Sequence, residues 1–299
     1  MNVTNAIKLI PAVKDYIWGG KKLKDYGVRS DAGRLAEAWV LSMHPDGPSL
    51  TEDGRALADV APRKTWGACC AKFKDFPVLI KLIDSAADLS VQVHPSDAYA
   101  LKNEGQYGKT EMWYVIDCDD GAGLYVGFKE AVTPGRYKKA VSDGTVTELM
   151  NFFRVKKGDR FFIAAGTVHA IGRGCTLAEV QQNSNLTYRV YDYNRLGADG
   201  KPRPLHIEKA LAVSSLTPYT PAVFEGGYLA DCEYFTVALR SEPFTAGRAD
   251  SFTGLTVVAG SGVIDGQSFT AGDAFYIGAG EAASVTGSFE MLEVFVKSR

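Results

Sequence analysis

The sequence lacks an excess of charge, a long apolar run and a cysteine framework. Its 299 residues carry a formal net charge of −2, which gives no support to binding of nucleic acid or an anionic membrane. It has no uninterrupted apolar run long enough to cross a bilayer, and residues 1–8 contain no apolar stretch typical of a signal peptide. The five cysteines are odd in number and have no CxxC spacing, which favours reduced thiols in the cytoplasm over disulfides.

Long helical patterns are also scarce, and short apolar runs separated by turn residues dominate the chain. We expect strands at Phe76–Ile83, Leu89–Val93, Met112–Asp117, Gly123–Phe128, Arg160–Ala164, Cys175–Gln181 and Leu186–Tyr193. Helices are expected only at Asp59–Lys72, from an N-cap at Ser96 to about Gly105, and at Glu208–Ser214. This pattern predicts a mostly β protein, built as a sandwich or barrel.

One segment occurs twice. The residues from Gly158 to Gly166 recur from Gly272 to Gly280, with six of the nine positions identical. In the same register His169 falls on Ala283, and Glu179 falls on Glu293. We therefore expect a fold unit that is present in two copies, of which only the first carries chemistry.

Proline and glycine cluster between Leu216 and Gly227, which indicates a linker. We therefore divide the chain into a catalytic, metal-binding domain at 1–225 and a C-terminal β domain without metal ligands at 226–299. An apolar content of 46% is enough for two hydrophobic cores.

Only four histidines exist, and two lie in informative positions. His94 shares one face of a predicted strand with Gln92, since the two are two residues apart. His169 ends the repeated segment, and its replacement by Ala283 in the second copy indicates that the fold does not need it. With Glu111 on a further strand, these residues offer two imidazoles, an amide oxygen and a carboxylate. That set favours Zn²⁺ and leaves Fe or Mn open. We expect His44 to lie in a loop and His206 to begin a helix, without a functional role.

Charged residues in apolar surroundings complete the candidate site. Lys81 lies in an otherwise apolar run, where burial is expected to lower its pKa toward a range useful for acid–base chemistry. Arg189 offers the two-pronged geometry that binds phosphate or carboxylate. Glu179 is a further candidate, although Glu293 at the equivalent position of the second copy favours a structural role equally.

Several segments together resemble the type I phosphomannose isomerases, in particular the short bacterial form. The matching pieces are Tyr16–Gly20, Ser90–Pro95, Gly108–Tyr114, Ala165–Gly172 and Thr187–Tyr193, in order along the chain from about residue 7 to 213. One departure is Ala164, where the family usually has proline in the turn before Ala-Gly. The chain is also too short for the large helical insertion of the long enzymes.

The resemblance implies a cupin fold, that is, a double-stranded β-helix or jelly roll, followed by a smaller degenerate cupin-like domain. It implies one Zn²⁺ held by Gln92, His94, Glu111 and His169, with active-site lysines at Lys81 and Lys109. Arg189 is the family's arginine beyond the cupin motifs, and Glu179 is its acidic residue.

The reaction that the resemblance implies is the interconversion of mannose 6-phosphate and fructose 6-phosphate through a cis-enediol. Either Lys81 or Glu179 would transfer the proton, and Arg189 and Lys109 would bind the phosphate or polarise the carbonyl oxygen. We expect a phosphosugar substrate, no nucleic-acid or membrane partner, and a monomer or homodimer. Two alternatives are a metal-dependent cupin oxygenase and a non-catalytic sugar-phosphate-binding protein on the same scaffold.

Overall fold

The computed structural model describes residues 5–197 and 200–299, and antiparallel strands dominate these residues. Residues 1–4 lie outside the described residues. They begin the stretch 1–8 that was expected not to be a signal peptide. The strands of the first part of the chain are β1 (Ala6–Ile10), β2 (Ala12–Lys14), β3 (Glu37–Leu41), β4 (Leu50–Thr51), β5 (Val78–Ser85), β6 (Val91–Val93), β7 (Glu111–Cys118), β8 (Gly123–Phe128), β9 (Met150–Arg154), β10 (Arg160–Ile163), β11 (His169–Ile171), β12 (Cys175–Gln182) and β13 (Tyr188–Tyr191). Those of the second part are β14 (Ala230–Asp231), β15 (Thr236–Arg240), β16 (Phe244–Ala246), β17 (Thr253–Ile264), β18 (Gln267–Thr270), β19 (Ala274–Ile277) and β20 (Ala283–Phe295).

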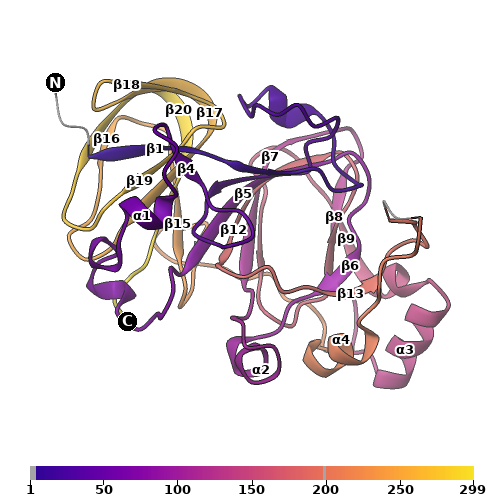
Figure 1. Cartoon of the computed structure of the whole chain (residues 1–299). Helices are drawn as coiled ribbons and strands as arrows, with labels where there is room; N and C mark the ends of the chain where they lie inside the picture. The colour runs from indigo at the N-terminus through magenta and orange to yellow at the C-terminus, as the bar shows by residue number, and fades with distance from the viewer. Residues whose placement is uncertain (1–4, 198–199) are drawn as a thin grey trace.

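The α-helices of the described residues are short and lie outside the sheets. They are α1 (Leu57–Val60), α2 (Asp97–Asn103), α3 (Pro134–Ser142) and α4 (Ile207–Val213). Helices α3 and α4 lie beside each other at the end of the first β unit that is farther from the chain termini (Figure 1). None of the helices in these residues is long and apolar enough to cross a membrane.

The first β unit consists of two antiparallel sheets that face each other. One has the strand order β10-β7-β12-β5-β3-β2, and the other has the order β13-β6-β11-β8-β9. Apolar side chains from both sheets fill the space between them, including Trp113, Val115, Leu124, Ile171 and Leu177. This arrangement confirms the expected mostly β, cupin-type fold, and it directs one face of several strands into a common interior.

The second β unit is a curved sheet with the main strand order β14-β15-β20-β17-β19-β1-β4. The aromatic side chains of Phe269, Phe275 and Phe289 form its own core. Strands β1 and β4 come from the start of the chain, and β1 pairs with β19 so that Ala6 lies opposite Ile277. The division at residues 225 and 226 stays a prediction, and this sheet extends across it. Figure 1 shows the indigo β1 among the yellow strands.

A third apolar cluster joins the two units. It contains Leu82, Tyr114 and Val180 from the first unit and Val237 and Leu292 from the second, all buried. The outer face of the six-stranded sheet is therefore covered by the second unit, which explains why all eight residues of β5 and of β12 are buried.

All seven predicted strands are present, with their ends shifted by at most two residues. The predicted helix at Asp59–Lys72 is wrong as a single element, because the segment forms only α1 and two short 3₁₀ turns, at Arg63–Thr65 and Ala68–Cys70. Gly67 interrupts it with a φ of 86°, a value that a helix cannot contain. Helix α3, with Thr133 as its N-cap and Pro134 in its first turn, was not predicted.

The repeated segments have the same local structure. Gly158 and Gly272, which precede the strands β10 and β19, have φ values of 87° and 94°. The side chain of Asp159 accepts a hydrogen bond from the backbone N–H of Lys156, and Asp273 binds Thr270 in the same way. Two sequence copies therefore specify the same turn and strand, which supports a duplicated fold unit.

Candidate active site

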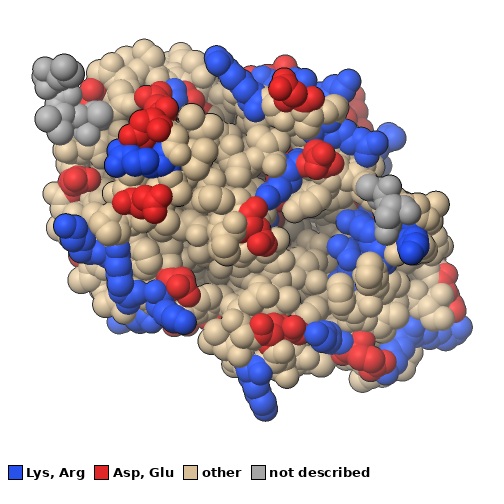
Figure 2. Space-filling model, in the orientation of Figure 1, with Lys and Arg blue, Asp and Glu red and all other residues tan. Residues whose placement is uncertain are grey.

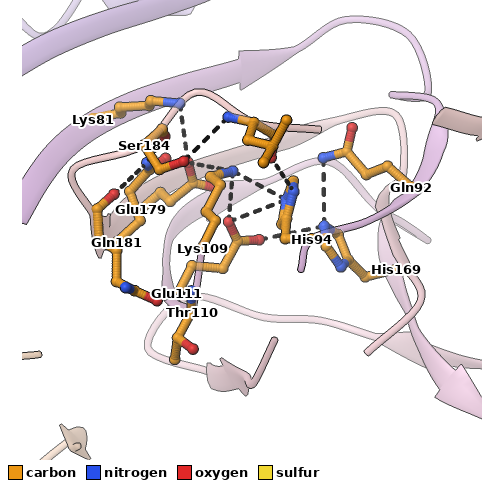
Figure 3. A network of polar contacts seen from close by, with 12 residues as sticks. Lys81, Gln92, His94, Lys109, Thr110, Glu111, His169, Glu179, Gln181 and Ser184 are labelled. Carbon is orange, nitrogen blue, oxygen red and sulfur yellow. Dashed lines mark hydrogen bonds and ion pairs between the residues drawn. The ribbon is translucent and has the colours of Figure 1, made fainter. Parts of the chain in front are cut away.

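Three strands bring the predicted metal ligands together in the interior of the first β unit. Gln92 lies in β6 and His94 directly follows this strand, while Glu111 and His169 are the first residues of β7 and β11. The pairing of β11 with β6 places His169 directly opposite Gln92. Figure 3 shows the four side chains pointing toward one another. The donor atoms of His94, Glu111 and His169 all lie within 4.8 Å of one another.

Backbone carbonyl groups orient both imidazole rings. The Nδ1 atom of His94 lies 2.9 Å from the carbonyl oxygen of Leu186, and Nδ1 of His169 lies 2.9 Å from that of Thr167. Each Nδ1 therefore carries the proton that it donates, and each Nε2 presents a lone pair to the centre of the cluster. Burial lowers the pKa of His94 well below its usual value and that of His169 to about 4, so both rings are neutral at physiological pH.

The carboxylate of Glu111 completes the cluster. It is fully buried, and its Oε2 is paired with the ammonium group of Lys109 at 2.7 Å. Its Oε2 lies 3.5 Å from Nε2 of His94, and its Oε1 lies 3.4 Å from Nε2 of His169. Ligand atoms of a tetrahedral zinc site with bonds of 2.0–2.1 Å lie about 3.4 Å apart. The spacing between Glu111 and each imidazole therefore matches that of ligands in such a site.

The amide of Gln92 lies at the edge of this cluster that faces the cavity. Its Nε2 is 3.4 Å from Nε2 of His169. A half-turn of the amide group presents the oxygen in place of the nitrogen, because the two atoms have nearly the same shape. Gln92 can therefore add an oxygen ligand to the two imidazoles and the carboxylate.

Lys81 lies between two carboxylates on neighbouring strands. Its Nζ is 3.4 Å from Oε2 of Glu37 and 3.3 Å from Oε1 of Glu179. Burial acts to lower its pKa, but the carboxylates of Glu37, Glu179 and Glu111 raise it above the usual value. The predicted net lowering of this pKa is therefore wrong, and Lys81 is held as an ammonium ion.

The two carboxylates beside Lys81 are fixed by buried tryptophans. The indole N–H of Trp39 donates to Glu37 at 2.6 Å, and that of Trp113 donates to Glu179 at 2.9 Å. Burial acts to raise the pKa of Glu179, but Lys109, Lys81 and Trp113 lower it to about 2. Glu179 is therefore ionised across the physiological pH range.

Lys109 connects this charged group to the metal-ligand cluster. Its Nζ lies 2.7 Å from Oε2 of Glu111, 3.1 Å from Nε2 of His94 and 3.8 Å from Oε1 of Glu179. A hydrogen bond fixes the loop that carries Lys109, because the backbone N–H of the next residue, Thr110, donates to the side chain of Gln182. Figure 3 shows the lysine between Glu179 and Glu111.

A cavity of about 280 Å³ opens beside Gln92 and leads to solvent. Its wall is formed by Tyr16, Trp18, Leu89, Ser90, Gln92, Asn185, Thr187, Arg189, Arg203 and His206. Arg189 lies opposite Gln92 in the pairing of β13 with β6, so its guanidinium group belongs to the same opening. Figure 2 shows a hollow in the middle of the molecule with Lys and Arg side chains gathered along one side. Lys81 and Glu179 lie deeper and are not part of this wall.

Three residues near the site were not predicted to have a role. Glu37 lies in a strand that is otherwise apolar. A single carboxylate among apolar residues was the sequence feature that could have indicated its role. Arg203 belongs to an irregular segment without a motif. His206 begins α4 as predicted, but it also lines the cavity, and its Nδ1 accepts a hydrogen bond from the backbone N–H of Arg189. His44, in contrast, packs edge-on against Trp39.

The second copy of the fold has lost each ligand position. Ala283 pairs with Ala246 in the way that His169 pairs with Gln92, so Arg248 stands where His94 does. Ile277 pairs with Thr253 in the way that Ile163 pairs with Glu111. The four equivalent residues are therefore Ala246, Arg248, Thr253 and Ala283. This unit contains none of the four ligand types at these places.

Glu293, the counterpart of Glu179, keeps a cationic partner. It is buried and accepts a hydrogen bond of 2.8 Å from Nε of Arg240. A buried carboxylate with a cationic partner thus occurs at this position in both copies, with and without the metal ligands. The carboxylate at this place has a structural function in at least one copy of the fold.

Comparisons with known proteins identify the family. Residues 6–115 match the catalytic domain of phosphomannose isomerase type I. A mannose-6-phosphate isomerase of Streptococcus mutans is 40% identical over 235 residues, which are 76% of this chain and 73% of that protein. The mannose-6-phosphate isomerase ManA of Bacillus subtilis is 40% identical over 208 residues, 68% of this chain and 66% of the relative.

A solved structure extends the match to nearly the whole chain. The crystal structure of the mannose 6-phosphate isomerase from Bacillus subtilis has a TM-score of 0.87 at 31% sequence identity, covering 97% of this chain and 99% of the other. The match includes both β units. The chain therefore belongs to the type I phosphomannose isomerases, a metal-dependent family with the cupin fold.

Proposed function

We propose that this chain is an aldose–ketose isomerase that interconverts mannose 6-phosphate and fructose 6-phosphate. The observation that carries the proposal is the set of donor atoms of His94, Glu111 and His169, spaced for a metal and adjoining a cavity with two arginines. The metal-ligand cluster suits the reacting oxygens of a sugar, and the arginines of the cavity suit its phosphate group.

We propose Zn²⁺ as the metal, one per chain, held by Gln92, His94, Glu111 and His169. Neutral imidazoles with one carboxylate suit this ion, the amide oxygen of Gln92 would supply the fourth ligand, and substrate would take a fifth position. When bound, the ion supplies Lewis-acid stabilisation of the negative charge that develops on the substrate oxygens.

The chemical step moves a proton between neighbouring carbon atoms. A base removes the proton from C2 of the open-chain aldose, the electron pair forms the C1–C2 double bond of a cis-enediol, and the carbonyl oxygen gains a proton. Loss of the proton from the C2 hydroxyl and return of a proton to C1 give the ketose. Because Lys81 is held as an ammonium ion, we propose the ionised Glu179, which lies deeper than the cavity wall, as the proton acceptor.

Glu179 is a weak base because its pKa is about 2. Stabilisation of the developing enediolate must therefore account for most of the lowering of the barrier. Lys109, with its ammonium 2.7 Å from Glu111, is the chain's own cation closest to the metal ligands. We propose that it polarises the carbonyl oxygen, while Arg189 binds the phosphate and so holds the reacting carbons in place.

A coupled assay for fructose 6-phosphate, run before and after chelation and after addition of stoichiometric Zn²⁺, tests the proposal. We expect activity that chelation abolishes and Zn²⁺ restores, without consumption of O₂. Oxygen consumption with Fe²⁺ would instead indicate a cupin oxygenase, and binding of mannose 6-phosphate without turnover would indicate a sugar-phosphate-binding protein. We further propose a cytoplasmic enzyme, since all five cysteines are free thiols.

A further inference from the structure

Three arginines surround a single carboxylate at the outer wall of the cavity. Asp192 is almost fully buried, with a side-chain exposure of 5%. It accepts hydrogen bonds from Arg195 at 2.6 Å and from Arg203 at 2.6 and 2.7 Å. Arg189 lies close enough to Arg203 that, after burial itself, repulsion from this second guanidinium contributes most to the lowering of its pKa.

The three guanidinium groups have different surroundings. Arg195 has donors directed to Asp192 and to the carbonyl oxygen of Asp88, and it stacks on Tyr193, so it braces the segment. Arg203 uses Nε and one Nη on Asp192, which leaves its Nη1 without a hydrogen-bond partner among the described residues. Arg203 lines the cavity, and Arg195 does not.

Arg189 lines the same cavity and also has an unused donor. One Nη donates to the carbonyl oxygen of Pro204 at 3.0 Å, whereas its buried Nε has no partner in the part of the chain that the structure describes. An unpaired buried donor on a charged group is costly, so this guanidinium has hydrogen-bonding capacity that the described residues leave unused.

The charges of this group do not balance. Three guanidinium ions and one carboxylate leave two positive charges, which matches the charge of a phosphate monoester at neutral pH. Hydroxyl groups of Tyr16, Ser90 and Thr187 line the same cavity and add neutral donors.

We propose that Arg203, aimed by its two-pronged hydrogen bond to Asp192, is a second phosphate-binding residue that acts together with Arg189. The inference rests on the proposed function for the identity of the sugar phosphate, but the binding of an anion can be measured without turnover. Asp192 is a positioning residue in this arrangement, because it touches Arg203 and not the cavity wall.

The test is the binding of inorganic phosphate to the Zn²⁺-loaded protein by calorimetry, together with steady-state kinetics on mannose 6-phosphate. In Arg203→Met we expect the dissociation constant for phosphate and the KM to rise about tenfold or more, the scale of a lost charge-assisted hydrogen bond, with kcat changed less than KM. Arg203→Lys should recover part of the loss. Arg136→Met, at an exposed arginine paired with Glu130, is the matched control and should change neither quantity.

Asp192→Asn separates orientation from charge. This variant makes the wall more positive, so a role for charge alone predicts tighter phosphate binding, whereas a role for orientation predicts weaker binding and a higher KM. Tighter binding would overturn the positioning role of Asp192.

Unchanged phosphate binding in a folded Arg203→Met protein would overturn the role of Arg203. The role of Arg203 would also be overturned if chelation of the metal abolished phosphate binding while the Arg203 variants left it unchanged. Absence of isomerase activity with intact, Arg203-dependent phosphate binding would instead count against the proposed function alone.

Discussion

Lys81 and Glu179 face each other across the neighbouring strands β5 and β12, with Nζ 3.3 Å from Oε1. Both side chains are buried, and Glu37 approaches the same ammonium from β3 on the opposite side. The lysine is thus the shared counter-ion of two buried carboxylates, of which Glu179 also has Lys109 at 3.8 Å. This arrangement holds Lys81 as an ammonium ion, which has no lone pair to accept a proton.

Replacement of Lys81 by Met should strongly destabilise the protein. It removes the charge and leaves Glu37 and Glu179 buried without this partner, and breaking such a buried pair costs about 3–5 kcal/mol. Urea denaturation of the metal-free proteins measures the loss. A change of less than about 1 kcal/mol, typical of an exposed pair, would show that the carboxylates find other partners.

The Glu179 carboxylate should make stability sensitive to acid. Its pKa is about 2 in the folded protein, against an ordinary value of 4.5. The unfolded chain therefore binds the proton first, so the stabilisation is present above pH 4.5 and is lost as the pH falls toward 2. The free energy of unfolding of metal-free protein at pH 5 and pH 3 should fall less in Glu179→Gln than in the wild type. Glu208→Gln, in an exposed pair with Lys138, is the control and should keep the wild-type slope.

Replacement of His169 by Ala should remove metal and activity and leave the fold intact. The second copy shows how the scaffold accommodates this change, because Ala283 begins β20 at the place where His169 begins β11. Metal analysis and circular dichroism of the purified variant check both halves of the prediction. Full metal occupancy in His169→Ala would contradict the ligand assignment.

Replacement of Arg189 by Lys should lower kcat/KM. We expect the loss to correspond to about 1.5–3 kcal/mol of transition-state stabilisation. The lysine keeps the charge but loses the planar group, including the Nη bond to Pro204. Steady-state kinetics on mannose 6-phosphate provide the measurement. An unchanged kcat/KM would mean that Arg189 only supports the cavity wall.

Local patterns in the sequence singled out side chains that the fold brings together, while their role as metal ligands stays a prediction. The alternation of β6 placed Gln92 and His94 on one face, and the repeat singled out His169, which the pairing with Gln92 brings into contact. The pKa of Lys81 was predicted with the wrong sign because its two carboxylates come from β3 and β12, which are far from it in the sequence. Long-range pairing of strands decides that shift, and a local apolar run reveals only the burial.

Residues of the irregular segment after β13 could not be predicted for a similar reason. Arg203 is oriented by its hydrogen bond to Asp192, eleven residues earlier. The segment between them is irregular, so no periodic pattern in the sequence predicts this contact. The segment Asp59–Lys72 does not form the expected single helix, because its backbone packs against the second unit. A Cβ atom at Gly67 would lie 2.3 Å from the backbone oxygen of Asp250.

The second unit should support the first without binding metal. Introducing histidine at Ala283 should create no metal site, because the partner positions hold Ala246, Arg248 and Thr253. Removing the residues after Glu225 should be far more damaging. It takes away β19, the partner of β1, and uncovers the apolar side chains of Leu82, Tyr114 and Val180. We expect the truncated chain to aggregate or to melt at a clearly lower temperature, as measured by size-exclusion chromatography and thermal denaturation, while Ala283→His should keep one metal per chain. A truncated protein that stayed monomeric, equally stable and fully active would show that the shared apolar cluster does not hold the catalytic unit together.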